Sequence, residues 1–521
     1  MEIGVRLVGV LLRLLNFLLT PLYWLRARDQ RKVPLLRNPL LLKSATELAA
    51  AVRNGEISSE DLVLLYINRV KEVEPFLNAV VEDRYKAAID EAKAVDRQME
   101  EAKRSGKFGE LIKEKPLLGV PFTVKESCSL EGLSNSVGCL ENDGSKAKTD
   151  GGVVALVKAA GGIPLLVSNT PELCLGWETT NLLRGATNNP YCLNRTPGGS
   201  SGGEGALLAC GASPLSVSSD IAGSIRLPAA FCGVFGHKPT PGVISITGHI
   251  PTLSDEQFPK FLTVGPMTRK ADDLYLLMNI MLDDKKDLLN LDTPVDMKDV
   301  KVHYMTEATT SIALIDVHEA IKDKITDAAK YLHKECGATI SQEKFLDLED
   351  SVEISISVFF SLRDIPNMLQ DPSDPKREKS FFLELAKYAC GGGSRSLQGL
   401  GFSVISKTRL FIPDSRTDFY NQKANSLRAQ MTQTLGSNGV LLYPVFNDLA
   451  HYHHGVFLKA SGVMYTMVFN ILGMPATTVP MGLYRGLPVS IQVIAAPNQD
   501  RLCLAVAKQL ELGFGGWRPP T

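Results

Sequence analysis

The pattern of hydrophobic and polar positions distinguishes an apolar N-terminal segment from the longer rest of the chain, in which apolar and polar stretches alternate. Residues 3–25 form an almost unbroken apolar run, about the length that a helix needs to cross a bilayer. A basic cluster follows within residues 26–32, and Tyr23 and Trp24 lie where aromatic side chains anchor helices at membrane interfaces. The pattern therefore predicts a membrane anchor with its basic flank over residues 1–32.

Two arginines within the apolar run leave the mode of attachment open. Arg6, Arg13 and Thr20 lie on one stripe of the predicted helix. An arginine at the bilayer centre costs about 2.5–3.5 kcal/mol, so the stripe also fits a helix lying in the interface. A single-pass anchor is favoured over an interfacial helix, with an endomembrane or lipid droplet as the expected location. A secretion signal is disfavoured because no small-residue cleavage site precedes the basic cluster.

Helical patterns come next, and strands alternate with helices after residue 116, which is typical of an α/β domain. Ser44 with Glu47 and Ser58 with Asp61 are helix-capping patterns. The pattern predicts helices over 78–103, 151–160, 206–210, 317–335 and 500–511, and strands over 116–124, 163–167, 215–217, 300–304, 477–480 and 489–494. No repeat or long linker separates these elements, so one domain is expected over residues 33–521.

A glycine- and serine-rich stretch within residues 380–412 separates two apolar runs. The simplest interpretation is an ordinary helix pair joined by a loop. The functional alternative is an apolar cap over a channel that also dips into a membrane.

Charge and cysteine content exclude several classes of protein. The formal net charge is −1, so no basic field indicates nucleic acid as a partner. Nine cysteines without a CxxC pair argue against a disulfide framework or a zinc site and fit buried thiols. We therefore expect no metal.

Glycines and serines are concentrated in residues 197–205, shortly before a second small-residue turn at residues 220–228. A flexible linker has a similar composition, but an apolar helix and strand follow this one at once. A phosphate-binding loop would need a Lys-Ser or Lys-Thr pair after the glycines, which is missing.

These small-residue turns fit serine hydrolysis, in which a base must take the proton of the nucleophilic hydroxyl. Ser224 is the candidate nucleophile. His237, the nearest histidine in sequence, lies in a turn-like stretch and is expected to be structural. Lys125 is the better base, because a lysine at the end of an apolar strand is desolvated, which favours its neutral form.

The backbone around Ser224 suggests an oxyanion hole. The amides of Ile221, Ala222, Gly223 and Ser224 form a small-residue turn and can converge on one oxygen. The flanking residues of this turn, Asp220 and Arg226, are expected to form a structural ion pair or a clamp on the backbone.

Three separate motifs, at residues 119–126, 198–203 and 220–226, strongly resemble the amidase signature family. The resemblance implies an α/β fold with a mixed β-sheet covered by helices on both faces. It also implies a Ser-cisSer-Lys triad without a cofactor. Lys125 matches the base, Ser224 the nucleophile and Ser200 the bridging serine. Gly199, joined to Ser200 by a cis peptide, and Ser201 match supporting positions, while Ala222 departs from the usual glycine and would narrow the oxyanion turn.

Within that family, residues 441–444, His453, His454 and residues 514–517 are similar to the membrane-bound lipid amidases. The resemblance implies hydrolysis of long-chain fatty acid amides. An amidase for small polar or peptide amides is the alternative. An amidotransferase subunit acting on charged tRNA is disfavoured by the anchor and the near-neutral charge. An inactive membrane-attached scaffold is disfavoured because the lysine and both serines are present. The oligomeric state stays open, with a homodimer as one candidate.

Overall fold

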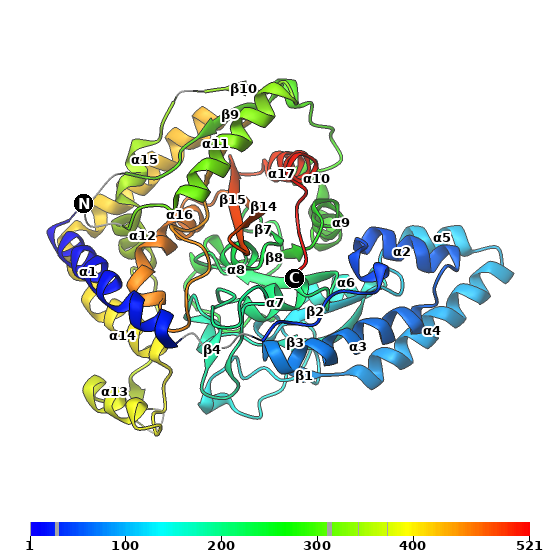
Figure 1. Cartoon of the computed structure of the whole chain (residues 1–521), viewed down its shortest axis with the longest axis horizontal. Coiled ribbons are helices and arrows are strands. Elements are labelled where there is room, and N and C mark those ends of the chain that lie inside the picture. The colour runs from blue at the N-terminus through cyan, green and yellow to red at the C-terminus, as the bar shows by residue number, and fades with distance from the viewer. Residues whose placement is uncertain (1, 27–30, 310–314, 342, 372–373) are drawn as a thin grey trace.

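The computed structural model describes residues 2–26, 31–309, 315–341, 343–371 and 374–521. Its centre is a mixed eleven-stranded sheet with the order β1-β3-β2-β6-β8-β7-β14-β15-β13-β9-β10 (Figure 1). The strands of this sheet are β1 Val80–Asp83, β2 Pro121–Lys125, β3 Ile163–Ser168, β6 Leu215–Asp220, β7 Phe235–Lys238, β8 Thr263–Thr268, β9 Lys301–Tyr304, β10 Thr339–Ile340, β13 Gly439–Pro444, β14 Ala476–Tyr484 and β15 Leu487–Ala495. Two small hairpins pair β4 Thr180–Asn181 with β5 Gly185–Ala186, and β11 Gln370–Asp371 with β12 Asp374–Glu378.

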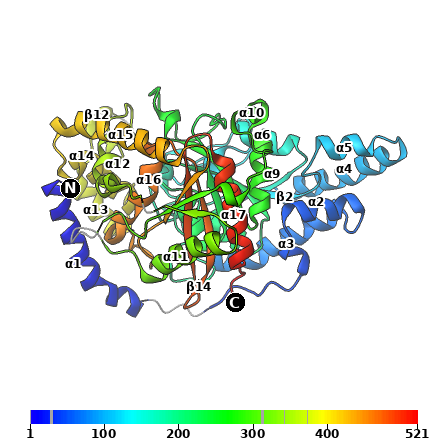
Figure 2. The same cartoon turned by 90° about the horizontal axis from the view of Figure 1, so that it is seen from above.

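Helices cover both faces of this sheet, as the family resemblance implies (Figures 1 and 2). The α-helices are α1 Ile3–Arg26, α2 Ala45–Asn54, α3 Ser59–Leu77, α4 Tyr85–Arg104, α5 Phe108–Glu114, α6 Gly152–Ala159, α7 Gly202–Ala209, α8 Arg226–Cys232, α9 Ala271–Met281, α10 Lys286–Leu289, α11 Glu319–Lys334, α12 Ser351–Phe359, α13 Phe381–Ala389, α14 Leu397–Thr408, α15 Thr417–Leu435, α16 Met464–Ile471 and α17 Asp500–Phe514. Short 3-10 helices that matter below are η5 Phe258–Lys260, η9 Arg409–Phe411 and η11 Val456–Val463.

Three parallel strands in this sheet, β3, β2 and β6, bring the candidate residues to one edge. β2 pairs in parallel with β6, with Thr123 opposite Ser216 and Val124 opposite Val217. Every residue of both strands is buried, as expected for parallel strands covered on both faces. Because parallel strands end at the same edge, Lys125 at the end of β2 lies near the end of β6.

Most predicted elements are present, but several predicted boundaries are wrong. For example, α7 begins at Gly202 rather than at residue 206, and β14 continues to Tyr484 rather than ending at residue 480. The capping box at Ser44 forms with Glu47, and the Ser58 side chain accepts a hydrogen bond from the Asp61 amide. The expected strand over 116–124 begins only at Pro121. The helix expected over 78–103 begins at Tyr85, because α3 ends at Leu77, its C-cap Asn78 is in a left-handed conformation, and residues 80–83 pair with β3.

Among the described residues, α1 is the helix long and apolar enough to cross a membrane, with a mean hydropathy of 1.8. It lies along one side of the molecule, near α12 and α14 and far from α4 and α5 (Figures 1 and 2). Gly4 lies so close to η9 that an added Cβ would stand 2.6 Å from Phe411 Cβ. On the side of α1 that faces away from η9, many side chains are exposed and apolar, including Leu7, Leu14 and Phe17.

Polar contacts hold α1 to the rest of the molecule at both ends of the helix. The Glu2 carboxylate accepts hydrogen bonds from Arg416 Nε at 3.0 Å and the Tyr420 hydroxyl at 2.7 Å. Near the other end, the Tyr23 hydroxyl donates to the carbonyl of His454 at 3.2 Å. The helix is therefore held against the rest of the molecule at both of its ends.

Candidate active site

Lys125 is completely buried and its amine is bonded to two serines. Lys125 Nζ lies 2.7 Å from Ser200 Oγ and 3.0 Å from Ser219 Oγ. Ser200 is also fully buried, and the peptide bond between Gly199 and Ser200 is cis. The structure thus brings together the lysine and the first serine of the expected triad.

The glycine-rich tract around Ser200 packs too closely for larger residues. A Cβ added at Gly199 would lie 2.8 Å from the carbonyl oxygen of Gly176, and one at Gly203 would lie 2.7 Å from the backbone of Asn169. These glycines therefore allow the tract to pack against neighbouring backbone. The Ser201 amide donates to the carbonyl oxygen of Ser224 at 3.2 Å, which joins this tract to the second small-residue turn.

The turn carrying Ser224 is held by a buried ion pair between Asp220 and Arg226. The Arg226 guanidinium contacts both carboxylate oxygens of Asp220 at 3.1 Å, and Asp220 also accepts from the amides of Gly223 and Ile225. Burial disfavours the ionised form of Asp220, but the charge and hydrogen bonds of Arg226 outweigh it and lower the pKa of the carboxyl. The predicted ion pair and the predicted backbone clamp are therefore both present.

The amides of this turn are not all available to a substrate. Gly223 N–H donates to Asp220 Oδ1 at 2.8 Å, whereas the amides of Ile221, Ala222 and Ser224 have no acceptor among the described residues. Gly223 also has a φ of +105°, and an added Cβ would stand 2.2 Å from Thr466 Oγ1. Only glycine fits this conformation and this space.

His237 has the structural role expected from the sequence, but it lies in strand β7 and not in a turn. It is fully buried, with Nδ1 2.7 Å from Thr477 Oγ1 and Nε2 3.1 Å from Asp500 Oδ1. Both ring nitrogens are thus engaged with β14 and the start of α17. Burial lowers the pKa of this histidine.

Ser224 lies at the wall of an apolar cavity of about 320 Å³. Ile221 and Ala222 line the same cavity, together with residues of α12, α14 and η11. Val5, Val8, Gly9 and Leu12 of α1 complete the lining, so the N-terminal helix is part of the wall. The size is within the usual range for small-molecule sites.

The two helices α13 and α14 form the expected pair joined by a loop. The second of them, α14, contributes Gly401, Phe402, Val404 and Ile405 to the cavity wall. Phe382 and Leu383 of α13 are exposed.

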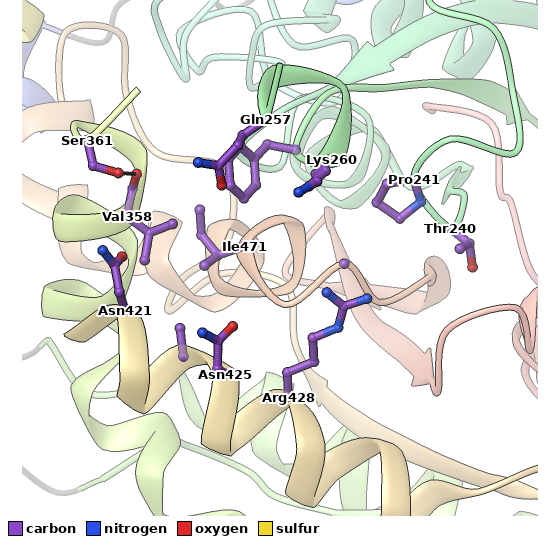
Figure 3. Close-up of a pocket in the computed structure, with 13 residues that line it drawn as sticks. Thr240, Pro241, Gln257, Lys260, Val358, Ser361, Asn421, Asn425, Arg428 and Ile471 are labelled. Atoms are coloured by element: carbon purple, nitrogen blue, oxygen red, sulfur yellow. Dashed lines mark hydrogen bonds between the residues drawn. The ribbon is translucent and has the colours of Figure 1, made fainter. Parts of the chain in front are cut away.

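A second cavity of about 520 Å³ is polar and is not lined by any of the expected triad residues. Figure 3 shows Gln257 and Lys260 of the η5 region opposite Asn425 and Arg428 of α15. Phe261 in its wall accepts a hydrogen bond from Asn470, which also bonds to Asp220. Because Ser224 lines the apolar cavity instead, that cavity is the candidate substrate site.

Sequence reasoning missed three parts of this site. Ser219 directly precedes the recognised motif, yet nothing in the sequence pairs it with Lys125. His249 Nε2 lies 2.9 Å from Ser219 Oγ, but it belongs to a loop without a recognisable motif. The contact of α1 with the cavity was also missed, because an apolar helix gives no sign of which surface it covers.

Comparison with known proteins agrees with this geometry. The family model for amidases matches residues 61–504, so the chain belongs to the amidase signature family. The chain is similar to fatty-acid amide hydrolase 2-A of Danio rerio, with 38% identity covering 99% of this chain and 97% of the relative. It is also 37% identical to fatty-acid amide hydrolase 2 of Homo sapiens, covering 92% of this chain and 91% of that protein.

A solved structure described as fatty acid amide hydrolase has the same fold, with a TM-score of 0.72 at 22% identity. The match covers 92% of this chain and 86% of that chain. The chain is thus an amidase-family hydrolase acting on carbon–nitrogen bonds.

Proposed function

We propose that the protein hydrolyses fatty acid amides to a fatty acid and an amine, with Ser224 as nucleophile. The observation that carries the proposal is the position of Ser224 in the wall of an apolar cavity. The Ser201 amide joins the turn of Ser224 to the glycine-rich tract, in which Ser200 is bonded to Lys125. Neutral Lys125 accepts the proton of Ser200 while Ser200 accepts the proton of Ser224. Ser224 Oγ then attacks the carbonyl carbon of the amide.

The amides of Ile221, Ala222 and Ser224 stabilise the oxyanion of the tetrahedral intermediate. The Gly223 amide instead holds the turn onto Asp220, which keeps the other amides oriented. Ala222 adds a methyl group at the cavity wall, so the carbonyl group of the substrate must enter beside this methyl group.

The same relay completes the reaction. When the C–N bond breaks, Ser200 gives a proton to the leaving nitrogen and is reprotonated by Lys125, because an amine anion is a very poor leaving group. Water then loses a proton through the relay and attacks the acyl ester, and Ser224 recovers its hydroxyl. No metal or organic cofactor takes part in this scheme.

The apolar lining favours a long acyl chain over a small polar amide. Most of the cavity wall consists of aliphatic and aromatic side chains. Transfer of an alkyl chain from water to such a wall is favourable, because it buries apolar surface. Similarity to relatives named fatty-acid amide hydrolase supports the same substrate class.

We further propose that α1 attaches the protein to a membrane as an interfacial helix. One face lines the cavity and both ends contact the body, while the opposite face is apolar and exposed. A helix lying in the interface satisfies these contacts and still buries the exposed face in lipid. Substrate would then enter the cavity from the lipid side of α1.

This arrangement predicts that Gly9→Phe shifts the preference of the enzyme toward shorter acyl chains. The phenyl ring would take up space in a wall of a cavity of only about 320 Å³. We expect kcat/KM for oleamide to fall roughly tenfold or more relative to that for hexanamide, since a lost CH₂ burial costs about 0.8 kcal/mol. The measurement is hydrolysis of primary amides of graded chain length.

The matched control is Leu7→Phe, because Leu7 lies on the exposed side of the same helix. It should leave the chain-length profile unchanged. An unchanged profile in Gly9→Phe would exclude α1 from the substrate wall. Faster hydrolysis of glutamine or a short amide than of oleamide by the wild-type protein would contradict the fatty-amide proposal itself.

A further inference from the structure

Lys125 has a second hydroxyl neighbour besides Ser200, and this neighbour belongs to a buried chain of hydrogen bonds. Ser219, the penultimate residue of β6, places Oγ 3.0 Å from Lys125 Nζ. His249 Nε2 lies 2.9 Å from the same oxygen, and His249 Nδ1 lies 2.9 Å from the carbonyl oxygen of Pro251. The three side chains linked by these hydrogen bonds, Lys125, Ser219 and His249, are all buried.

The loop that carries His249 is fastened to the site by its backbone. Ile250 N–H donates to the carbonyl oxygen of Ser127 at 2.9 Å. The Ser129 hydroxyl donates to the carbonyl oxygen of Gly248 at 2.5 Å. These bonds on both sides of His249 hold its ring against Ser219.

The carbonyl of Pro251 sets the direction of the hydrogen bonds, because a carbonyl oxygen can only accept. His249 Nδ1 must therefore carry the ring hydrogen. Burial lowers the pKa of His249, so the ring holds a single proton at neutral pH. Nε2 is then an acceptor, and the single hydrogen of the Ser219 hydroxyl points to it.

A Ser219 hydroxyl used in this way can only accept from Lys125. The neutral amine therefore directs one N–H at Ser219 Oγ, and its lone pair is left for the Ser200 hydroxyl. Ser127 Oγ, at 3.5 Å from Ser219 Oγ, is too distant to compete with these shorter bonds.

We propose that His249 is a positioning residue that acts through Ser219 and keeps the lone pair of Lys125 directed at Ser200. This proposal rests on the proposed function, since it takes Lys125 as the base. Without His249, the Ser219 hydroxyl can rotate and donate its hydrogen to Lys125. The amine lone pair is then occupied, and the proton of Ser200 has no acceptor.

The variant His249→Phe tests the proposal, because phenylalanine keeps an aromatic ring but removes the acceptor. We expect kcat for oleamide to fall roughly tenfold with little change in KM, since one competing hydrogen bond is worth about 1 kcal/mol or slightly more. His249→Gln should restore most of the rate, because its amide can accept from Ser219 and donate to Pro251.

Ser219→Ala provides the decisive background. Without the Ser219 hydroxyl there is nothing for His249 to orient, so adding His249→Phe should change kcat less than about twofold. A kcat loss that is equally large in both backgrounds would overturn the proposal and indicate a packing role. An unchanged kcat in His249→Phe alone would also overturn it.

The labelling of Ser224 by a fluorophosphonate separates this inference from the proposed function. If the wild-type protein is labelled at Ser224 while the His249 and Ser219 effects are absent, only the positioning role fails. If the label is found on another residue, the catalytic assignment fails first.

Discussion

Ser224→Ala is expected to lower the hydrolysis of oleamide by roughly 10⁴-fold or more, the scale seen when a nucleophilic serine is removed. The hydroxyl has no substitute in the variant, because Ser200 is enclosed and bonded to Lys125. The turn itself should persist, since Asp220 and Arg226 hold its backbone without the Ser224 side chain. Steady-state release of oleic acid by the purified protein measures the effect.

The control for this substitution is Ser490→Ala, which removes another buried serine hydroxyl far along the chain. Its hydroxyl donates to the carbonyl of Ala230 and should influence stability only. A Ser224→Ala protein that keeps more than about a hundredth of the wild-type rate would place the nucleophile elsewhere, because such a loss is within the range of a supporting group.

Lys125→Met is expected to lower kcat by about 10²–10⁴-fold, the contribution typical of a general acid–base group. Methionine is similar in length but cannot accept a proton, so Ser200 would keep its hydrogen. KM should change little, because Lys125 is not among the residues that line the apolar cavity. The measurement is kcat and KM for oleamide, with thermal unfolding to confirm that the variant is folded.

Lys238→Met is the matched control, since Lys238 is the other lysine buried this completely in the described part of the chain. Burial and the charge of Arg226 lower the pKa of Lys238 to about 7, so it could in principle act as a base. Its amine, however, donates to the carbonyl of Pro239 rather than to a serine. If Lys238→Met abolished activity while Lys125→Met did not, the base would be misassigned.

The sequence alone predicted the parts of the site that depend on local pattern. An apolar strand ending in Lys125 and a small-residue turn flanked by Asp220 and Arg226 are visible without coordinates, because strand burial and turn composition leave periodic and compositional signs. The choice of Ser200 over Ser201 came only from the family resemblance. Its bond to Lys125 agrees with that choice.

Contacts between distant segments could not be predicted in this way. His249 reaches Ser219 through a loop whose course depends on backbone bonds to Ser127 and Ser129. The use of the Gly223 amide by Asp220 depends on side-chain rotation, which composition does not encode. Likewise, an apolar helix such as α1 carries no sequence sign of whether it leaves the protein or covers a cavity.

The central claim, that Ser224 becomes acylated within the apolar cavity, is tested most directly by locating the covalent adduct. The protein is treated with a long-chain alkyl fluorophosphonate, digested, and examined by peptide mass spectrometry. The account predicts one modified peptide with the adduct on Ser224, and its loss in Lys125→Met when labelling times are short. An adduct on Ser200, Ser201 or any other residue, with Ser224 unmodified, would contradict the account.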